Sequence, residues 1–161
     1  MIPIRNIYYM LAYAFQVLHE QGYTDVAAED FRNTAELLAA ILCKGVSVLI
    51  KRGLCRQYIT KEEPLASPRG KLEIGESIKT QVFRKKQIVC AYDEFSVNAY
   101  TNRIIKTTMA VLLRADISKT RKKEIRKLLV FFDGVDTLDA HNINWNIQYD
   151  RNNQTYRMIL E

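Results

Sequence analysis

The sequence has little of what metal sites and disulfide frameworks require. Its 161 residues include three cysteines, Cys43, Cys55 and Cys90, and two histidines. The cysteines are widely spaced without a Cys-x-x-Cys pair, and no nucleophile pattern accompanies the histidines. Zinc binding, a disulfide framework and histidine-based catalysis are therefore not indicated. This cysteine usage is typical of a protein of the reducing cytoplasm.

Two catalytic motifs are also missing. A nucleotide-binding P-loop needs Gly-x-x-x-x-Gly-Lys-Ser/Thr, but Leu72 follows the single Gly70-Lys71 pair and Leu65 occupies the first glycine position. A common metal-dependent nuclease motif needs Asp/Glu-x-Lys, because carboxylates hold the metal and the lysine positions water. None of the 18 acidic residues is followed two positions later by lysine. We therefore expect this chain by itself to be no enzyme.

Long hydrophobic runs are absent as well. The apolar N-terminal segment is interrupted by Arg5 and Asn6, is too short to span a bilayer, and lacks the basic lead and cleavage site of a signal peptide. Lys44 and Lys51 interrupt the next apolar segment. The sequence predicts a soluble, cytoplasmic protein without a membrane anchor.

The composition is that of one globular domain, with 48% hydrophobic and 26% charged residues. The net charge is +6 and the pI is about 9.2. This excess permits a polyanionic partner, but it matters only where the basic residues cluster.

Hydrophobic periodicity predicts helices at both ends of the chain. One helix is expected from about Asn6 to His19, and a second from Asn33 to Gly53, with Asn33 and Glu36 as a capping box. Ser118 caps a third expected helix that runs to Phe132. Residues 135–147 are expected to be irregular, with Trp145 as an anchor, and residues 149–161 to be helical. Because no cap, Gly or Pro ends that last helix, we expect the chain to be part of a longer protein.

Between these blocks the pattern changes to short strands. Strands are expected at 54–60, 69–74 and 87–92, with a polar turn at 62–68, a short helix at 77–82 and a basic turn at 83–86. The fold class is therefore α+β: mainly helical, with a small antiparallel sheet or projecting hairpin between two helical blocks.

The clearest helix is expected at Tyr92–Arg114, capped by Ser96 or Asn98. It has a broad apolar face, and its narrower polar side has one compact cluster: Asn102, Arg103 and Lys106. This cluster is either a solvated stripe or a functional surface.

Two further basic groups remain open to more than one interpretation. The helix at 119–127 is either a solvated surface or a site of phosphate contact. Its nucleic-acid candidates are Lys119, Lys122, Lys123 and Arg126. The strand ends have five basic residues that could enter a partner's pocket: Arg69, Lys71, Arg84, Lys85 and Lys86.

Four sequence blocks occur in a distinctive order: IPIRNIYYMLAYAF, KGVSVLIKRGLCRQY, PRGKLEI and YDEFSVNAYTNRIIKTTMAVLLR. Together they resemble the N-terminal half of the McrC family of McrBC-type, modification-dependent restriction systems. The resemblance covers essentially the whole chain.

The resemblance implies that residues 1–161 are an adaptor domain. In that family the N-terminal region threads a stalk into the pore of a hexameric AAA+ GTPase, McrB, and stimulates hydrolysis of the GTP that McrB binds. A C-terminal PD-(D/E)xK domain, which uses Mg²⁺, cuts DNA and would follow residue 161. The candidates on the stalk are the five strand-end basic residues, with the 102–106 cluster as a second group. The alternatives are a DNA-backbone-binding module that uses the 119–127 helix, and a structural support for the nuclease.

Overall fold

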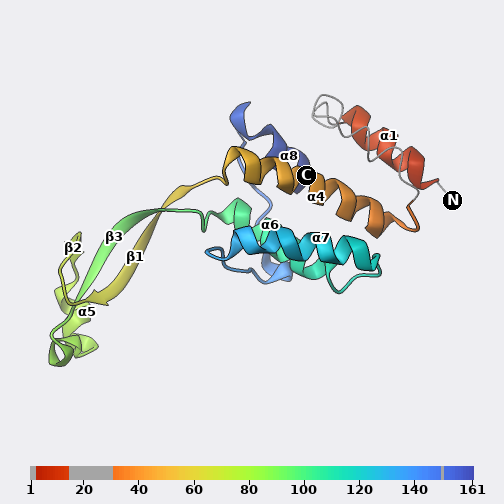
Figure 1. The fold of residues 1–161 in the computed structure, drawn as a ribbon. Coiled ribbons are helices and arrows are strands. Elements are labelled where there is room, and N and C mark those ends of the chain that lie inside the picture. The colour runs from red at the N-terminus through yellow and green to blue at the C-terminus, as the bar shows by residue number, and fades with distance from the viewer. Residues whose placement is uncertain (1–2, 15–30, 150) are drawn as a thin grey trace. The chain divides into compact units, whose positions relative to one another are not determined.

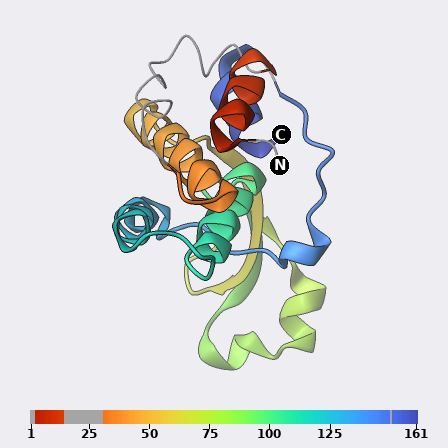
Figure 2. The same cartoon turned by 90° about the vertical axis from the view of Figure 1, so that its right-hand side faces the viewer.

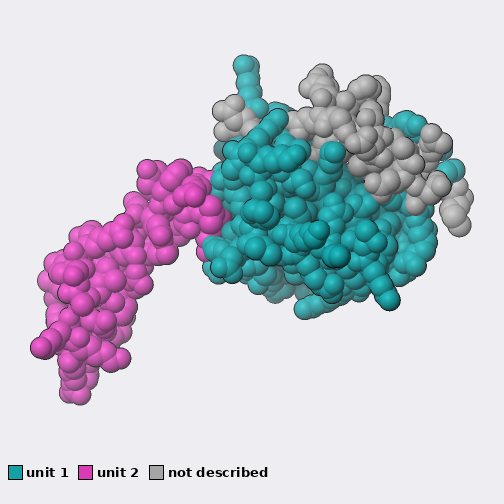
Figure 3. All heavy atoms as spheres, viewed as in Figure 1, with its two compact units in different colours: residues 1–55, 100–161 teal, residues 56–99 magenta. Residues whose placement is uncertain are grey.

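The computed structural model describes residues 3–14, 31–149 and 151–161. The chain forms two compact units (Figure 3): a helical unit of residues 1–55 and 100–161, and a sheet unit of residues 56–99. Among the described residues, no helix is both long and apolar enough to cross a bilayer. The sequence-predicted class, α+β with a small antiparallel sheet between helical blocks, is confirmed.

The helical unit is built around helix α4 (Thr34–Arg52). It packs against α1 (Ile4–Ala14), α7 (Lys119–Leu129) and α8 (Gln154–Leu160), and α6 (Tyr100–Leu112) packs against α7 and α8 (Figures 1 and 2). Short 3₁₀ turns follow at Val130–Phe132, Ala140–Asn142 and Arg151–Asn153. The fully buried side chains include Leu37, Val46, Ile104, Ile105, Met109, Ile125 and Phe132.

Two helix caps confirm local sequence signals. Asn33 Oδ1 accepts a 2.8 Å hydrogen bond from the Glu36 N–H at the start of α4, and Ser118 Oγ accepts from the Arg121 N–H at the start of α7. The reciprocal half of the predicted capping box is absent, because Glu36 accepts instead from the N–H and hydroxyl of Ser118, each at 2.7 Å. Glu36 is 8% exposed. One buried carboxylate therefore joins the first turns of two helices.

The boundaries of α1 and α6 differ from the prediction. The predicted first helix begins at Ile4 and is described to Ala14; its expected continuation to His19 lies outside the described residues. The helix expected from Tyr92 begins at Tyr100, because residues 92–96 belong to strand β3. Ser96 therefore belongs to β3, where its Oγ accepts the Asn98 N–H at 3.1 Å, and it does not cap α6; a cap by Asn98 stays a prediction.

The sheet unit contains three strands in the order β1-β3-β2. Strands β1 (Gln57–Leu65) and β3 (Ile88–Ser96) pair antiparallel over nine positions, from Gln57↔Ser96 to Leu65↔Ile88. Residues 62–65 belong to this ladder, so the polar turn predicted at 62–68 begins too early. Pro64 is tolerated there because β1 is an edge strand.

The strand expected at 69–74 is shorter in the structure, and the short helix expected at 77–82 begins three residues earlier. Strand β2 spans only Lys71–Leu72, and it is followed by helix α5 (Ile74–Lys79) and the 3₁₀ turn η1 (Val82–Lys85). The buried Ser77 hydroxyl donates to Glu73 O and accepts the Val89 N–H, both at 2.8 Å. This side chain holds α5 against the start of β3.

Gly70 allows the chain to approach β3 closely. Its φ is +68°, and a Cβ built there would lie 2.4 Å from Ala91 O and 2.7 Å from Tyr92 Cβ. Both the dihedral angle and the space therefore require glycine.

Trp145 was expected to anchor residues 135–147, but its side chain is 57% exposed. Other contacts hold this segment. Leu138 N–H donates to Thr107 Oγ1 at 2.9 Å, and Asn144 N–H donates to Tyr100 Oη at 2.7 Å. Hydrogen bonds to α6 and the buried side chain of Val135, which is 2% exposed, thus hold this segment in place of the tryptophan.

Candidate functional site

The sheet unit has almost no core of its own. Within residues 56–99, the buried residues are Ser77, Val89, Cys90 and Ala99. Even the cross-strand pair Tyr58 and Phe95, with ring centroids 5.0 Å apart, is 75% and 53% exposed. A unit of this size buries little apolar surface by itself. Its side chains are therefore available to a partner.

Four large apolar side chains are exposed along the consecutive elements β2, α5 and η1. Ile74 and Ile78, one helical turn apart on α5, are 56% and 63% exposed. Leu72 precedes them in β2 at 43%, and Phe83 follows in η1 at 49%. We call these four residues the apolar docking set. Exposed apolar groups gathered in this way are typical of protein-binding surfaces.

Two of the five strand-end basic residues are engaged within the sheet unit. The Arg69 guanidinium lies 4.2 Å from the centroid of the Tyr92 ring, and Lys71 Nζ lies 2.6 Å from Glu73 Oε1. The hydrogen bond and charge of Glu73 raise the pKa of Lys71. The Tyr92 hydroxyl donates to Glu63. Arg69 and Lys71 thus each have a contact within the sheet unit before any partner binds, and the Lys71 contact is an exposed ion pair.

The other three, Arg84, Lys85 and Lys86, form an exposed basic turn. Gln81 and Lys86, on either side of η1, have φ of +54° and +56°. Left-handed backbone in residues other than glycine costs about 1–2 kcal/mol per residue, and such strain often marks functional segments. Among the described residues, no acidic side chain pairs with this basic turn.

The basic turn lies at one end of the β1–β3 ladder. It precedes Ile88, the partner of Leu65, whereas the chain connects to the rest of the protein beside Gln57 and Ser96. Eight residue steps of about 3.3 Å separate the two ends of the ladder by roughly 26 Å. Within the sheet unit, the prediction that these charges lie near strand ends therefore agrees with the structure.

The 102–106 cluster is engaged inside the helical unit instead of forming a solvated stripe. Asn102 is fully buried; its Nδ2 donates to Cys55 O at 2.8 Å, and its Oδ1 accepts from the Tyr156 hydroxyl at 2.6 Å. Burial raises the pKa of Tyr156 to about 12. These contacts favour an internal role for Asn102, and partner contact by it stays a prediction.

Lys106 and Arg103 also contact the segment that follows α7. Lys106 Nζ donates to Phe132 O at 2.8 Å and to Val135 O at 2.6 Å. Arg103 Nη2 lies 3.9 Å from Asp136 Oδ2. Lys106 therefore satisfies backbone carbonyls at the end of a 3₁₀ turn, as cations near helix ends often do.

The comparisons with known proteins agree with this architecture. A family model described as McrBC 5-methylcytosine restriction system component matches residues 4–161. The chain belongs to this family. A relative in the McrBC family, the type IV methyl-directed restriction enzyme EcoKMcrBC of Escherichia coli (strain K12), is 30% identical over 161 residues. The match covers 99% of this chain and 46% of that protein, so the chain spans about half the length of its curated relative.

Solved McrBC structures share the fold. A chain in the cryo-EM structure of the Thermococcus gammatolerans McrBC complex matches with a TM-score of 0.64 and 20% identity, over 98% of this chain and 49% of that one. A half-complex of Thermococcus gammatolerans McrB AAA+ hexamers with bound McrC contains a chain that matches with a TM-score of 0.66 and 20% identity, over 98% and 39%.

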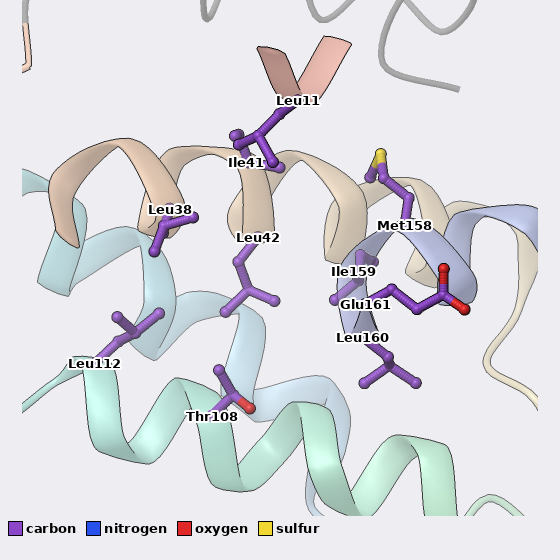
Figure 4. Close-up of a pocket in the computed structure, with 10 residues that line it drawn as sticks. All are labelled: Leu11, Leu38, Ile41, Leu42, Thr108, Leu112, Met158, Ile159, Leu160 and Glu161. Atoms are coloured by element: carbon purple, nitrogen blue, oxygen red, sulfur yellow. The ribbon is translucent and has the colours of Figure 1, made fainter. Parts of the chain in front are cut away.

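The helical unit of this McrBC family member also contains an apolar pocket of about 270 Å³. Figure 4 shows Leu42 of α4 facing Thr108 and Leu112 of α6, with α8 residues closing one side. Its polar lining residues are Thr108 and Glu161. Within the described ranges, no group of His, Cys, Asp or Glu could hold a metal ion.

Sequence reasoning missed the residues that tie the elements together. Tyr156 was assigned only to an apolar helix face, although its hydroxyl also accepts the Cys55 N–H at 2.8 Å. The contact with Cys55 joins positions 101 residues apart, so no local pattern could reveal it. The Arg69–Tyr92 contact was missed because only the pairing of β2 with β3 brings these two positions together.

Proposed function

We propose that residues 56–99 dock on a McrB-like AAA+ GTPase hexamer and stimulate its GTP hydrolysis, as the adaptor part of a McrBC-type restriction system. The observation that carries this proposal is a compact unit with almost no core, in which the apolar docking set and an unpaired basic turn occur together. Family membership and the likeness to a chain from McrB hexamers with bound McrC support it.

The two surfaces have different tasks in this proposal. Burial of Ile74, Ile78 and Phe83 against the partner supplies affinity, because it removes from water the half or so of each side chain that is exposed in the free chain. The charges of the basic turn, Arg84–Lys86, stabilise negative charge that develops during phosphoryl transfer in the partner's GTP site. A positioned cation can change such rates by about 10³-fold or more.

Arg69 and Lys71 act as preorganised neighbours in this mechanism. Tyr92 and Glu73 already restrict their side chains, so little conformational freedom is lost on docking. GTP belongs to the partner, and the resemblance assigns Mg²⁺ and DNA cleavage to a nuclease domain outside residues 1–161. This chain supplies docking and activation.

The test is the steady-state GTP hydrolysis rate of the cognate GTPase, titrated with the 161-residue chain. Saturable acceleration is expected. Arg84, Lys85 and Lys86 are each replaced by Ala. The variant at the position nearest the phosphates should lower the maximal rate by about tenfold, while the concentration for half-maximal stimulation stays nearly constant. Lys51→Ala, an exposed lysine at the end of α4, is the control.

Arg69→Ala and Lys71→Ala extend this series with smaller expected losses. Full stimulation by all five variants would contradict the assigned role of the basic residues. Absence of both binding and stimulation by the folded wild-type chain would contradict the proposal as a whole. Circular dichroism confirms folding in each case.

A further inference from the structure

Helix α7 presents a basic face that the proposed GTPase activation does not use. Lys119, Lys123, Arg126 and Lys127 are exposed, whereas Lys122 is half-buried at the edge of the face. With 3.6 residues per turn, the four exposed residues fall within a sector of about 100°. We call these four residues the α7 basic face.

The only acidic residue of α7, Glu124, is paired with a basic residue on the inner side of the helix. Arg121 Nη1 lies 2.7 Å from Glu124 Oε2, and Arg121 Nε lies 3.8 Å from Glu36 Oε1. Ile125 is fully buried beneath them. Glu124 is thus occupied by the one basic residue that faces inward. In the part of the chain that the structure describes, no carboxylate pairs with the outward-facing cations.

The helix is also rigidly placed. Ser118 caps its first turn and donates to the buried Glu36 carboxylate, so the backbone beneath the basic face is fixed on α4. Lys119, Lys123 and Lys127 then follow at four-residue steps and span about 12 Å along the axis. Duplex DNA carries one phosphate charge per about 1.7 Å of its axis. The face therefore matches the backbone of a short stretch of duplex.

We propose that the α7 basic face binds the phosphate backbone of duplex DNA without reading sequence. Charge complementarity carries the proposal, since none of the described carboxylates pairs with the four cations of this rigid face. The face has no amide residue of the kind that reads adenine, and its lysines and arginine suit contacts with phosphates. The surface would hold DNA close to the complex, while other parts of the system recognise the modified base.

The magnitude expected for four phosphate contacts is modest. Counterion release predicts a slope of log affinity against log salt concentration of about −3.6. The affinity should therefore fall by about 150-fold when the salt concentration rises from about 50 to about 200 mM. Dissociation constants of about 10⁻⁴–10⁻⁶ M are expected near physiological salt.

The experiment measures fluorescence anisotropy of a short labelled duplex without 5-methylcytosine, titrated with the 161-residue chain at several salt concentrations. The triple variant Lys119→Gln, Lys123→Gln, Arg126→Gln should weaken binding by about tenfold or more at low salt and reduce the slope by about 2.7. Lys127→Gln alone should reduce the magnitude of the salt slope by about 0.9.

The matched control changes three exposed basic residues elsewhere in the helical unit: Lys51→Gln, Arg52→Gln, Arg114→Gln. Both triple variants lower the net charge by three, so only the position of the charge differs. Equal weakening by the two triples, or no DNA binding by the wild-type chain at about 50 mM salt, would overturn the proposal.

The alternative partner of the α7 basic face is an acidic protein surface. Val130 and Phe131, which are exposed just beyond the helix, could add apolar contacts to such an interface. If the α7 triple variant binds DNA like the wild-type chain but loses affinity for the GTPase, the face is a protein interface and the DNA proposal fails. Because DNA binding is measured without the GTPase, its outcome is independent of the proposed adaptor function.

Discussion

The hydroxyl of Tyr156 donates a 2.6 Å hydrogen bond to Oδ1 of Asn102, and both side chains are buried. The same hydroxyl accepts the Cys55 N–H, and Asn102 Nδ2 donates to Cys55 O. Cys55 directly precedes the sheet unit, and Asn102 follows shortly after it. One tyrosine on α8 therefore fixes the chain on both sides of the insertion.

Tyr156→Phe is expected to destabilise the helical unit by about 1–3 kcal/mol, because it removes two hydrogen bonds, one from the Cys55 N–H and one to the buried Asn102 amide oxygen. The midpoint of urea unfolding measures this change. Tyr149→Phe is the control and should stay within about 0.5 kcal/mol of the wild type. Equal effects of the two substitutions would show that the buried network contributes nothing specific.

Stability should fall at alkaline pH. Burial raises the pKa of Tyr156 from 10.0 to about 12 and that of Cys43 from 9.0 to about 12. Both groups are held neutral in the folded state, so their contribution is complete below pH 9 and is lost as pH rises toward 12. Urea midpoints of the wild-type chain and Tyr156→Phe should converge between pH 10 and 12. A constant difference would contradict the assignment to Tyr156.

Gly70→Ala is expected to detach β2 from β3. Gly53→Ala is a matched control, since Gly53 also has positive φ, at +91°, but a Cβ there meets nothing within 4 Å. Both variants suffer a backbone penalty, because both glycines have a positive φ that side chains with a Cβ disfavour, and only Gly70→Ala adds a collision with β3. Faster hydrogen exchange of the Glu73 N–H, which donates to Val89 O, should appear in Gly70→Ala alone.

Ser118→Ala should cost about 1–2 kcal/mol, because it removes a helix cap and a hydrogen bond to the buried Glu36 carboxylate. Ser47→Ala is the control: its hydroxyl bonds only to Cys43 O in its own helix, where alanine is well accommodated. Thermal unfolding distinguishes the two. If the Ser118→Ala variant is as stable as the Ser47→Ala variant, Ser118 does not fix the helix beneath the α7 basic face.

Ile78→Gln should weaken docking on the GTPase by about tenfold without loss of stability, because Ile78 is already 63% exposed in the free chain. This prediction rests on the proposed function. Val111 is also β-branched and lies on a helix, and it is 50% exposed. Val111→Gln is therefore the control and should leave docking unchanged. Similar binding by both variants would exclude Ile78 from the interface.

Local signals predicted the parts of the fold that depend on neighbouring residues. Asn33 and Ser118 cap helices as expected, since a cap requires only residues three positions apart. The start of α6 was wrong because residues 92–96 suit a strand once β1 is available to pair with them. That pairing is non-local and overrides the helical pattern.

The candidate site followed the same division. The sequence identified the basic residues at 84–86 and placed them near strand ends, because the hydrophobic pattern marks where strands begin. It could not reveal that Arg69 packs on Tyr92 or that Asn102 is buried, since both depend on contacts between distant segments. Which basic residues remain unpaired is therefore information that only the structure supplies.

The pairing of Gln57 with Ser96 gives the sheet unit a modular character. Since antiparallel partners lie about 5 Å apart, the chain departs for the sheet and returns from it at nearly the same point. Residues 56–99 could then be exchanged for a short turn, or for the corresponding segment of a relative, with no gap left to bridge in the helical unit. If residues 56–99 dock on the partner as proposed, exchange of this one insertion changes partner specificity while the surrounding helices remain the same.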